Sequence, residues 1–248
     1  MLNTKENFME IRIFDTPEEI GFACADIFEE LLSSKPDCVL GLATGASPVP
    51  TYNELVKRCK NGKISFQQAT SFNLDEYCDL PKNDKNSYYT FMHENLFDHI
   101  DIKEENVHIL NGNAKDTAKE AAEFDAAIDA AGGIDIQLLG IGTNGHIGFN
   151  EPGESFPEGT FKVKLTDSTI ASNSIYFEED SMPRYALTMG IGSIMKAKKI
   201  VLIATGEKKA EAILKTVKGN VSPSCPASVL QQHPDAILLI DKAAAKLL

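Results

Sequence analysis

An asparagine, a histidine and a glutamate follow an apolar run within a glycine-rich segment near the middle of the chain. Residues 134–141 are expected to form a buried parallel strand, because they are apolar on both faces and number about as many as a usual strand. Asn144, His146 and Glu151 come soon after it. Open α/β sheets bind ligands outside the carboxyl ends of their strands. A lone histidine there more often caps a neighbouring carbonyl, but the nearby amide and carboxylate favour an acid–base site.

Two adjacent carboxylates, Asp75 and Glu76, follow a second apolar strand that is expected over 69–74. Side chains at this position either cap a helix or take part in chemistry. Neighbouring carboxylates repel each other, so one of them is expected to have a raised pKa. A raised carboxylate pKa suits a base that works near neutral pH. The pair is therefore a candidate source of the general base.

Two further strand ends carry groups that suit an anion. A turn of small residues precedes an expected helix and consists of Thr44, Gly45, Ala46 and Ser47. Backbone N–H groups, hydroxyls and the helix dipole favour negative charge at such a turn. The turn matches neither a Walker A nor a GxGxxG pattern, so a nucleotide is not expected. Lys208 and Lys209 stand in the first turn of another expected helix, where lysine opposes the dipole. This position favours an anionic ligand, more clearly for Lys209 than for Lys208, which is equally well explained as a solvated residue.

The elements that must position these groups alternate between strands and helices. Strands are expected over 10–14, 38–42, 69–74, 107–110, 134–141, 186–189, 199–204 and 236–240. Helices are expected over 17–33, 48–59, 86–99, 115–131, 191–196, 207–217 and 226–231, and from Lys242 onward. This alternation predicts an α/β fold: a single doubly wound, Rossmann-like domain over 1–248, with a mostly parallel sheet flanked by helices.

Two segments fall outside the regular alternation. Residues 1–8 are polar and are expected to be an N-terminal extension. Residues 152–181 contain several prolines and glycines and are expected to cover the site, with one strand-like stretch at 161–165.

Composition narrows the class of protein. The formal net charge of −12 argues against binding to nucleic acid or to an anionic membrane surface. Five widely spaced cysteines without a CxxC pattern are typical of reduced thiols in the cytoplasm and not of a zinc site. We therefore expect a cytoplasmic enzyme that moves protons on a small phosphorylated metabolite.

Six stretches, in order over nearly the whole chain, resemble the glucosamine-6-phosphate deaminase (isomerase) family. They are LGLATGASP at 40–48, SFNLDEY at 71–77, SYYTFMH at 87–93, LNGN at 110–113, GHIGFNEP at 145–152 and YALTMG at 185–190. The related 6-phosphogluconolactonases share the fold and a Gly-His after the same strand, but not the Phe-Asn-Glu-Pro continuation.

The resemblance implies an aldose–ketose isomerisation with deamination, in which glucosamine 6-phosphate and water give fructose 6-phosphate and ammonia without a metal or organic cofactor. It implies that His146, supported by Asn144 and Glu151, assists ring opening. Asp75 would then move a proton from C2 to C1 of the open chain. The residues that fall where the family holds the phosphate are Thr44, Gly45, Ala46, Ser47 and Lys209.

Two positions depart from the family pattern. Asn144 stands where many members have Asp, and Ile175 stands where many have an Arg that reaches the phosphate. The sequence leaves Arg184, Lys162 and Lys164 open as replacement cations. It also leaves open galactosamine 6-phosphate as the substrate, a 6-phosphogluconolactonase, a non-catalytic sugar-phosphate sensor, and either a monomer or a small homo-oligomer. A sensor of this kind would carry a helix-turn-helix module and lose the base.

Overall fold

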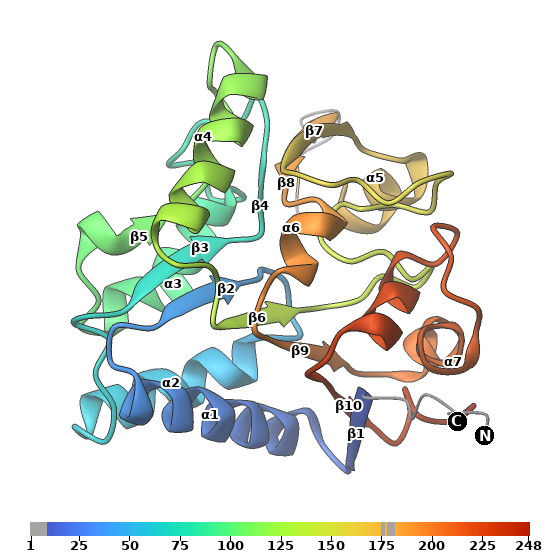
Figure 1. Cartoon of the computed structure of the whole chain (residues 1–248), viewed down its shortest axis with the longest axis horizontal. Coiled ribbons are helices and arrows are strands. Elements are labelled where there is room, and N and C mark those ends of the chain that lie inside the picture. The colour runs from blue at the N-terminus through green and yellow to red at the C-terminus, as the bar shows by residue number, and fades with distance from the viewer. Residues whose placement is uncertain (1–8, 175–176, 178–181) are drawn as a thin grey trace, which may run out of the picture.

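The computed structural model describes residues 9–174, 177 and 182–248. A seven-stranded sheet crosses the molecule within these residues, and its neighbouring strands are parallel (Figure 1). The strand order is β1-β10-β9-β6-β2-β3-β5. The strands are β1 (Met9–Phe14), β2 (Val39–Leu42), β3 (Thr70–Asn73), β5 (Val107–His108), β6 (Ile136–Leu139), β9 (Lys199–Ala204) and β10 (Ala236–Asp241). This architecture confirms the predicted α/β class with a mostly parallel sheet.

Helices cover both faces of the large sheet, as the parallel strands require. One face packs on α1 (Pro17–Ser34), α2 (Val49–Lys60) and α3 (Tyr88–Asn95). The other face packs on α4 (Thr117–Ala130), α6 (Ile191–Met195) and α7 (Ala210–Lys218). Short 3₁₀ helices are η1 (Phe97–His99), η2 (Glu104–Asn106), η4 (Glu207–Lys209) and η5 (Pro226–Gln232). Successive strand residues point to opposite faces, so Val39 joins one apolar core and Leu40 the other.

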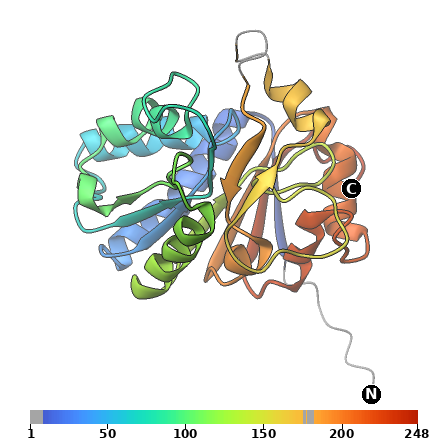
Figure 2. The same ribbon diagram turned by 90° about the horizontal axis from the view of Figure 1, so that it is seen from above.

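A second sheet of three antiparallel strands lies beside the large one (Figures 1 and 2). Its order is β4-β8-β7, and its strands are β4 (Asp75–Tyr77), β8 (Tyr185–Thr188) and β7 (Phe161–Lys164). The sequence predicted strands at 161–165 and 186–189, close to β7 and β8, but neither β4 nor the pairing of the three strands into a second sheet. The chain leaves the large sheet at Leu74, whose carbonyl accepts a hydrogen bond from the Met189 N–H at 2.9 Å. The carboxylates expected just after a strand therefore lie on a strand themselves.

The covering segment contains regular structure. Besides β7 it holds the helix α5 (Asp167–Asn173), whose N-cap Thr166 accepts a hydrogen bond from the Thr169 N–H. A small apolar cluster joins this segment to β4 and β8 through Tyr77, Leu165 and Ala186. Residues 175–176 and 178–181 of the segment lie outside the described residues, as does the proposed extension over 1–8.

The prediction of a helix from Lys242 onward is wrong. Residues 242–247 form turns. Their backbone hydrogen bonds mix spacings, with Ala245 N–H bonding to Asp241 and Lys246 N–H bonding to Ala243. The seven residues after β10 are too few for alanine-rich sequence to form a stable helix without further packing. The helix expected over 86–99 is also shorter than predicted, because Leu96 separates α3 from η1.

The direction of the chain through the large sheet reverses between β2 and β6. From β2 the chain continues to β3 and β5 on one side, and from β6 it continues to β9 and β10 on the other. Because β2 and β6 are hydrogen-bonded neighbours, the loops that follow them diverge and leave a crevice at their carboxyl ends. Open α/β sheets bind ligands at such a switch point.

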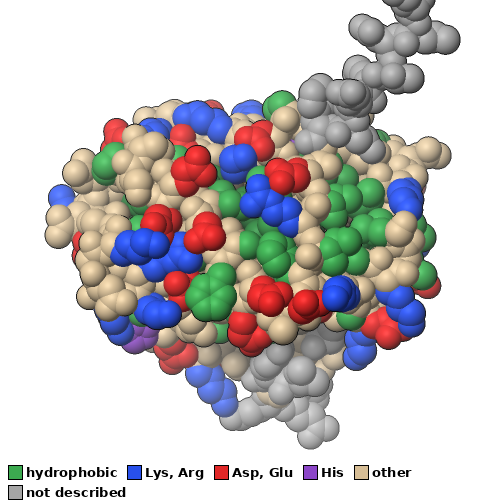
Figure 3. Space-filling model, turned by 90° about the horizontal axis from the view of Figure 1, so that it is seen from below, with side chains coloured by type: hydrophobic (Ala, Val, Ile, Leu, Met, Phe, Trp, Pro, Cys, Tyr) green, Lys and Arg blue, Asp and Glu red, His purple; other side chains and the backbone are tan. Residues whose placement is uncertain are grey.

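The face below the sheet carries basic and acidic side chains interspersed with apolar ones (Figure 3). Arg58 of α2 forms ion pairs with Asp26 and Glu29 of α1, which hold these two helices together. Among the described residues, no helix combines the length and the apolar composition needed to cross a membrane.

Candidate active site

A pocket of about 470 Å³ opens at the switch point of the large sheet. We call it the main pocket. Its walls come from the ends of β2, β3, β6 and β9, together with α3 and α5. Its polar and turn-forming lining residues include Thr44, Gly45, Ala46, Ser47, Asp75, Tyr88, Asn144, His146, Thr169, Asn173, Thr205 and Lys209. The main pocket thus brings together all of the site residues predicted from the sequence except Glu151, which lies directly behind His146.

The turn at 44–47 joins β2 to α2 and forms one wall of the main pocket. Gly45 has a φ of 103°, a conformation that favours glycine over residues with a Cβ. The buried Tyr52 hydroxyl donates to the Ala43 carbonyl at 2.5 Å and accepts from the Ala43 N–H at 3.2 Å, which fixes the start of the turn. Within the described chain no side chain caps the first turn of α2. The helix itself offers few free donors, because Pro48 and Pro50 carry no N–H and the Val49 N–H bonds to a carbonyl of the turn. The N–H groups that can face an anion are therefore those of the turn at 44–47.

Asp75 reaches the main pocket from β4 and is 5% exposed. Burial, together with the charge of the adjacent Glu76, raises the pKa of Asp75 to about 8. Among the described residues, no N–H or O–H group donates a hydrogen bond to its carboxylate. A carboxylate of this kind takes up and releases a proton near neutral pH.

The His146 ring and the Glu151 carboxylate lie side by side at the base of the main pocket. His146 Nδ1 lies 3.4 Å from Glu151 Oε1. The Asn144 side-chain amide donates to Glu151 Oε2 at 2.7 Å, and its oxygen accepts from the His146 backbone N–H at 3.1 Å. The Thr169 hydroxyl of α5 donates to Glu151 Oε1. Burial raises the pKa of Glu151, but His146, Thr169 and Asn144 together outweigh it and lower the pKa to about 2. Glu151 is therefore a permanent negative charge behind the imidazole.

The small sheet holds the loop that carries His146. The buried Asn150 amide donates to the Ile147 carbonyl at 2.9 Å and to the Met189 carbonyl at 2.8 Å. Thr188 of β8 accepts a hydrogen bond from the Phe149 N–H at 3.1 Å. A Cβ at Gly142 would lie within 2.4 Å of three atoms of the His146 ring, so only glycine allows the ring to rest on this turn.

Among the described residues, Lys209 is the only lysine or arginine that lines the main pocket. Burial lowers its pKa from the ordinary value. The other cations that the sequence left open do not line the pocket. Arg184 and Lys164 are exposed, and the Lys162 ammonium lies 4.8 Å from the centroid of the Tyr185 ring. Ile175 lies outside the described residues. Those residues also contain no group of three or more His, Cys, Asp or Glu side chains arranged to hold a metal ion.

Tyr88, Asn173 and Thr169 are among the lining residues that were not predicted as site residues. Tyr88 of α3 donates a hydrogen bond to the Tyr77 hydroxyl at 3.3 Å, and Asn173 of α5 donates to the same hydroxyl at 3.1 Å. Thr169 contacts Glu151, as described above. The motif at 87–93 contains Tyr88, but no role for that residue was predicted from the resemblance. Nothing in the local sequence of α5 indicates which of its polar side chains reach the site.

Comparisons with known proteins show the family of the chain. Residues 17–239 match the family model described as glucosamine-6-phosphate isomerases/6-phosphogluconolactonase. A glucosamine-6-phosphate deaminase of Lysinibacillus sphaericus is 52% identical over 233 residues, which cover 94% of this chain and 97% of the relative.

Solved structures extend the comparison. One described as a monomeric glucosamine-6-phosphate deaminase superposes with a TM-score of 0.94 at 46% identity, covering 97% of this chain and all of the other. A 6-phosphogluconolactonase from Trypanosoma cruzi has a TM-score of 0.79 at 18% identity, covering all of this chain and 99% of the other, and shares the fold. The chain belongs to the family of glucosamine-6-phosphate isomerases and 6-phosphogluconolactonases.

Proposed function

We propose that the chain is a glucosamine-6-phosphate deaminase, which converts glucosamine 6-phosphate and water to fructose 6-phosphate and ammonia. One observation carries the proposal: a buried carboxylate, a histidine–carboxylate pair and an anion-binding turn open into the same pocket. Relatives that are about half identical to the chain and bear this name support it.

The turn at 44–47 and Lys209 bind the phosphate in this proposal. The turn supplies N–H donors at the positive end of α2, and Lys209 supplies a partly buried positive charge. Holding the phosphate at one end fixes which carbon of the sugar meets Asp75.

His146 acts first, as the base that opens the pyranose ring. The neutral imidazole takes the proton of the C1 hydroxyl and returns it to the ring oxygen, so that the closed sugar becomes an open-chain aldehyde. Because Nδ1 faces Glu151, the other ring nitrogen is left for the substrate. Glu151 stays ionised and stabilises the imidazolium that forms during the transfer.

Asp75 acts second and moves a proton from C2 to C1. Its carboxylate removes the C2 proton, which leaves an enolamine, and returns the proton to C1, which gives a ketimine. Water adds to the ketimine carbon, and ammonia leaves as the C2 ketone of fructose 6-phosphate forms. A pKa near 8 suits both halves of this transfer, because the group must accept a proton and then release it.

The test is release of ammonia and fructose 6-phosphate from glucosamine 6-phosphate, measured together and in equal amounts. Galactosamine 6-phosphate and 6-phosphogluconolactone are assayed in parallel, because a galactosamine-specific enzyme or a lactonase would act on these instead. Asp75→Asn serves as the inactive control. Turnover of the lactone alone, without ammonia from either amino sugar, would contradict the proposal.

Finer assignments follow from the same proposal. The net reaction hydrolyses a carbon–nitrogen bond of an amino-sugar phosphate, which makes the enzyme a hydrolase of amino-sugar catabolism. We propose a cytoplasmic monomer, supported by the solved relative that is described as monomeric. Light scattering at several protein concentrations tests the monomer, and a mass that doubles would contradict it.

A further inference from the structure

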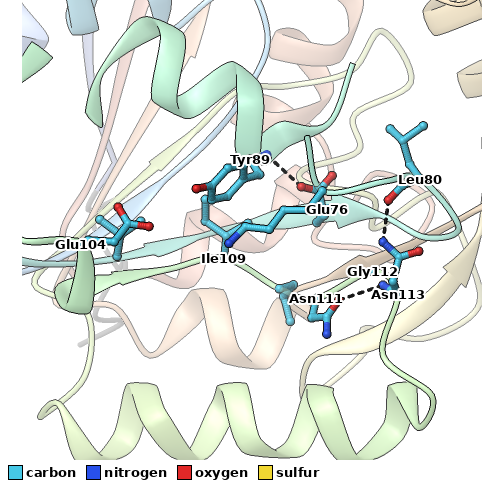
Figure 4. Close-up of a pocket in the computed structure, with 11 residues that line it drawn as sticks. Glu76, Leu80, Tyr89, Glu104, Ile109, Asn111, Gly112 and Asn113 are labelled. Carbon is cyan, nitrogen blue, oxygen red and sulfur yellow. Dashed lines mark hydrogen bonds between the residues drawn. The ribbon is translucent and has the colours of Figure 1, made fainter. Parts of the chain in front are cut away.

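A second pocket, of about 280 Å³, borders β4 and the beginning of α3 (Figure 4). Its lining includes Glu76, Lys82, Tyr89, Glu104, Asn111 and Asn113. Successive residues of β4 and of α3 divide between the two pockets. Asp75 and Tyr88 line the main pocket, whereas Glu76 and Tyr89 line the second. The reaction as described above uses no group of the second pocket.

Glu76 ties β4 to the beginning of α3. One carboxylate oxygen accepts from the Tyr77 N–H at 2.8 Å and from the Tyr88 N–H at 3.0 Å. The other accepts from the Tyr89 N–H at 2.8 Å, which is the bond between these two residues drawn in Figure 4. Tyr88 and Tyr89 open α3, so the carboxylate also meets the positive end of that helix. A single side chain therefore fixes both the strand that carries Asp75 and the turn that carries Tyr88.

The two adjacent carboxylates differ in what surrounds them. Glu76 has three N–H donors, whereas none among the described residues donates to Asp75. Both are buried. Two close carboxylates repel each other when both are ionised, and the one with more hydrogen-bond donors keeps its negative charge. Burial raises the pKa of Glu76 as well, but its N–H donors partly offset that rise, whereas the pKa of Asp75 rises to about 8. The charge is therefore held on Glu76 in preference to Asp75, and Asp75 takes up the proton.

We propose that Glu76 is a positioning residue for the deaminase reaction, which orients Tyr88 and Asp75 and supplies a fixed negative charge next to the base. This inference rests on the proposed function. It predicts that Glu76 sets the pH at which Asp75 becomes competent to remove the C2 proton. Asp75 must be ionised for that step, so kcat/KM falls as the pH drops below the pKa of Asp75, about 8.

Other charged groups near the pair are few among the described residues. In the second pocket Lys82 places its ammonium 4.0 Å from the centroid of the Tyr89 ring, and Glu104 of η2 lies across the pocket from Glu76. In the main pocket His146 and Lys209 share the cavity with Asp75. The Tyr52, Tyr77 and Tyr88 phenols near Asp75 stay neutral, because burial raises the pKa of each.

The experiment is the pH profile of kcat/KM for Glu76→Gln. The amide keeps the shape and an acceptor oxygen but removes the charge, so the acidic limb should move to lower pH by about one unit. Glu76→Asp keeps the charge and should leave the limb near its place. Glu104→Gln is the matched control, because it removes a negative charge from the same pocket without touching the β4–α3 junction. A purely structural role for Glu76 would lower kcat without moving the limb, and that result would overturn the proposal.

Folding of each variant is checked by circular dichroism. If Glu76→Gln does not fold, Glu76→Asp carries the test, because the shorter side chain keeps the charge beside Asp75 but withdraws it from the N–H groups of α3. Turnover should then fall with the acidic limb near its place, and a limb that moves to lower pH would overturn the proposal. A wild-type protein without deaminase activity would contradict the proposed function itself, whereas an active Glu76→Gln with an unshifted limb contradicts only this inference.

Discussion

The two sheets contribute different kinds of group to the main pocket. The large parallel sheet ends in the turn at 44–47 and, after β9, in the segment that carries Lys209. These groups are N–H donors, hydroxyls and a cation, which suit the binding of an anion. The small antiparallel sheet carries Asp75 on β4 and, through Thr188 and Asn150, holds the loop with His146. These groups suit proton transfer.

This division separates anion binding, at the strand ends of the large sheet, from proton transfer, which depends on the small sheet. Turns between parallel strands and helices present backbone donors wherever the strands end, so anion binding comes with the architecture. Proton transfer needs a buried carboxylate at one defined place, and an added antiparallel strand supplies it. Changes in the small sheet should therefore affect kcat, and changes at the ends of the large sheet should affect KM.

The largest effect is expected for Asp75→Asn, which removes the proposed base from the small sheet. Turnover should fall by about 10²–10⁴, the range for loss of a general base, while KM stays nearly constant. Solvent deuterium should enter C1 of the wild-type product, because the proton passes through Asp75. Initial rates over a substrate series measure both constants. A variant with normal turnover would exclude this role for Asp75.

Lys209→Met tests the large sheet. Loss of a charged hydrogen-bond donor to the phosphate should raise KM by about 10- to 100-fold, because such bonds contribute about 1.5–3 kcal/mol. The value of kcat should change far less. Lys208→Met is the matched control, since Lys208 is the exposed neighbour and does not line the main pocket. A fall in kcat at constant KM would break the proposed division between the two sheets.

Much of the large sheet could be predicted from the sequence because its signals are local. The strand at 199–204 was predicted with the bounds that it has, since a lysine and a Thr-Gly turn bracket an apolar run. The turn at 44–47 and Lys209 were predicted for the same reason. Each lies next to a strand whose apolar residues by themselves predict that it is buried.

The small sheet could not be predicted because its partners are distant in sequence. Asp75 pairs with Thr188, more than a hundred residues away, and a three-residue strand has too short a pattern to detect. The hydroxyl of Thr169 reaches Glu151 only because α5 folds over the loop. Contacts of this kind depend on how the segments pack together, which no periodicity encodes.

Thr169→Val tests whether the covering segment contributes to the proton-moving half of the site. The valine keeps the shape but cannot donate to Glu151, so the carboxylate loses one of its three side-chain partners. Turnover should fall by about tenfold, which corresponds to one hydrogen bond to a charged group. Thr169→Ser should restore most of it, because serine keeps the hydroxyl. Equal activity of the valine and serine variants would show that α5 does not support Glu151.

The smallest effect is expected for Asn144→Asp, which brings in the residue that many family members carry. The new carboxylate would face Glu151 at the place where the amide now donates at 2.7 Å. Two carboxylates this close share a proton near neutral pH, so the variant gains less than one full charge beside His146. Added negative charge favours the imidazolium, so the pKa of His146 should rise by up to about one unit. Titration of the imidazole by NMR, with His146→Gln to assign the signal, measures this directly, because Asp75 governs the acidic limb of the kinetic profile. A pKa that stays in place or falls would show that position 144 is not coupled to His146 through charge, and that the loop held by the small sheet is tuned by hydrogen bonding alone.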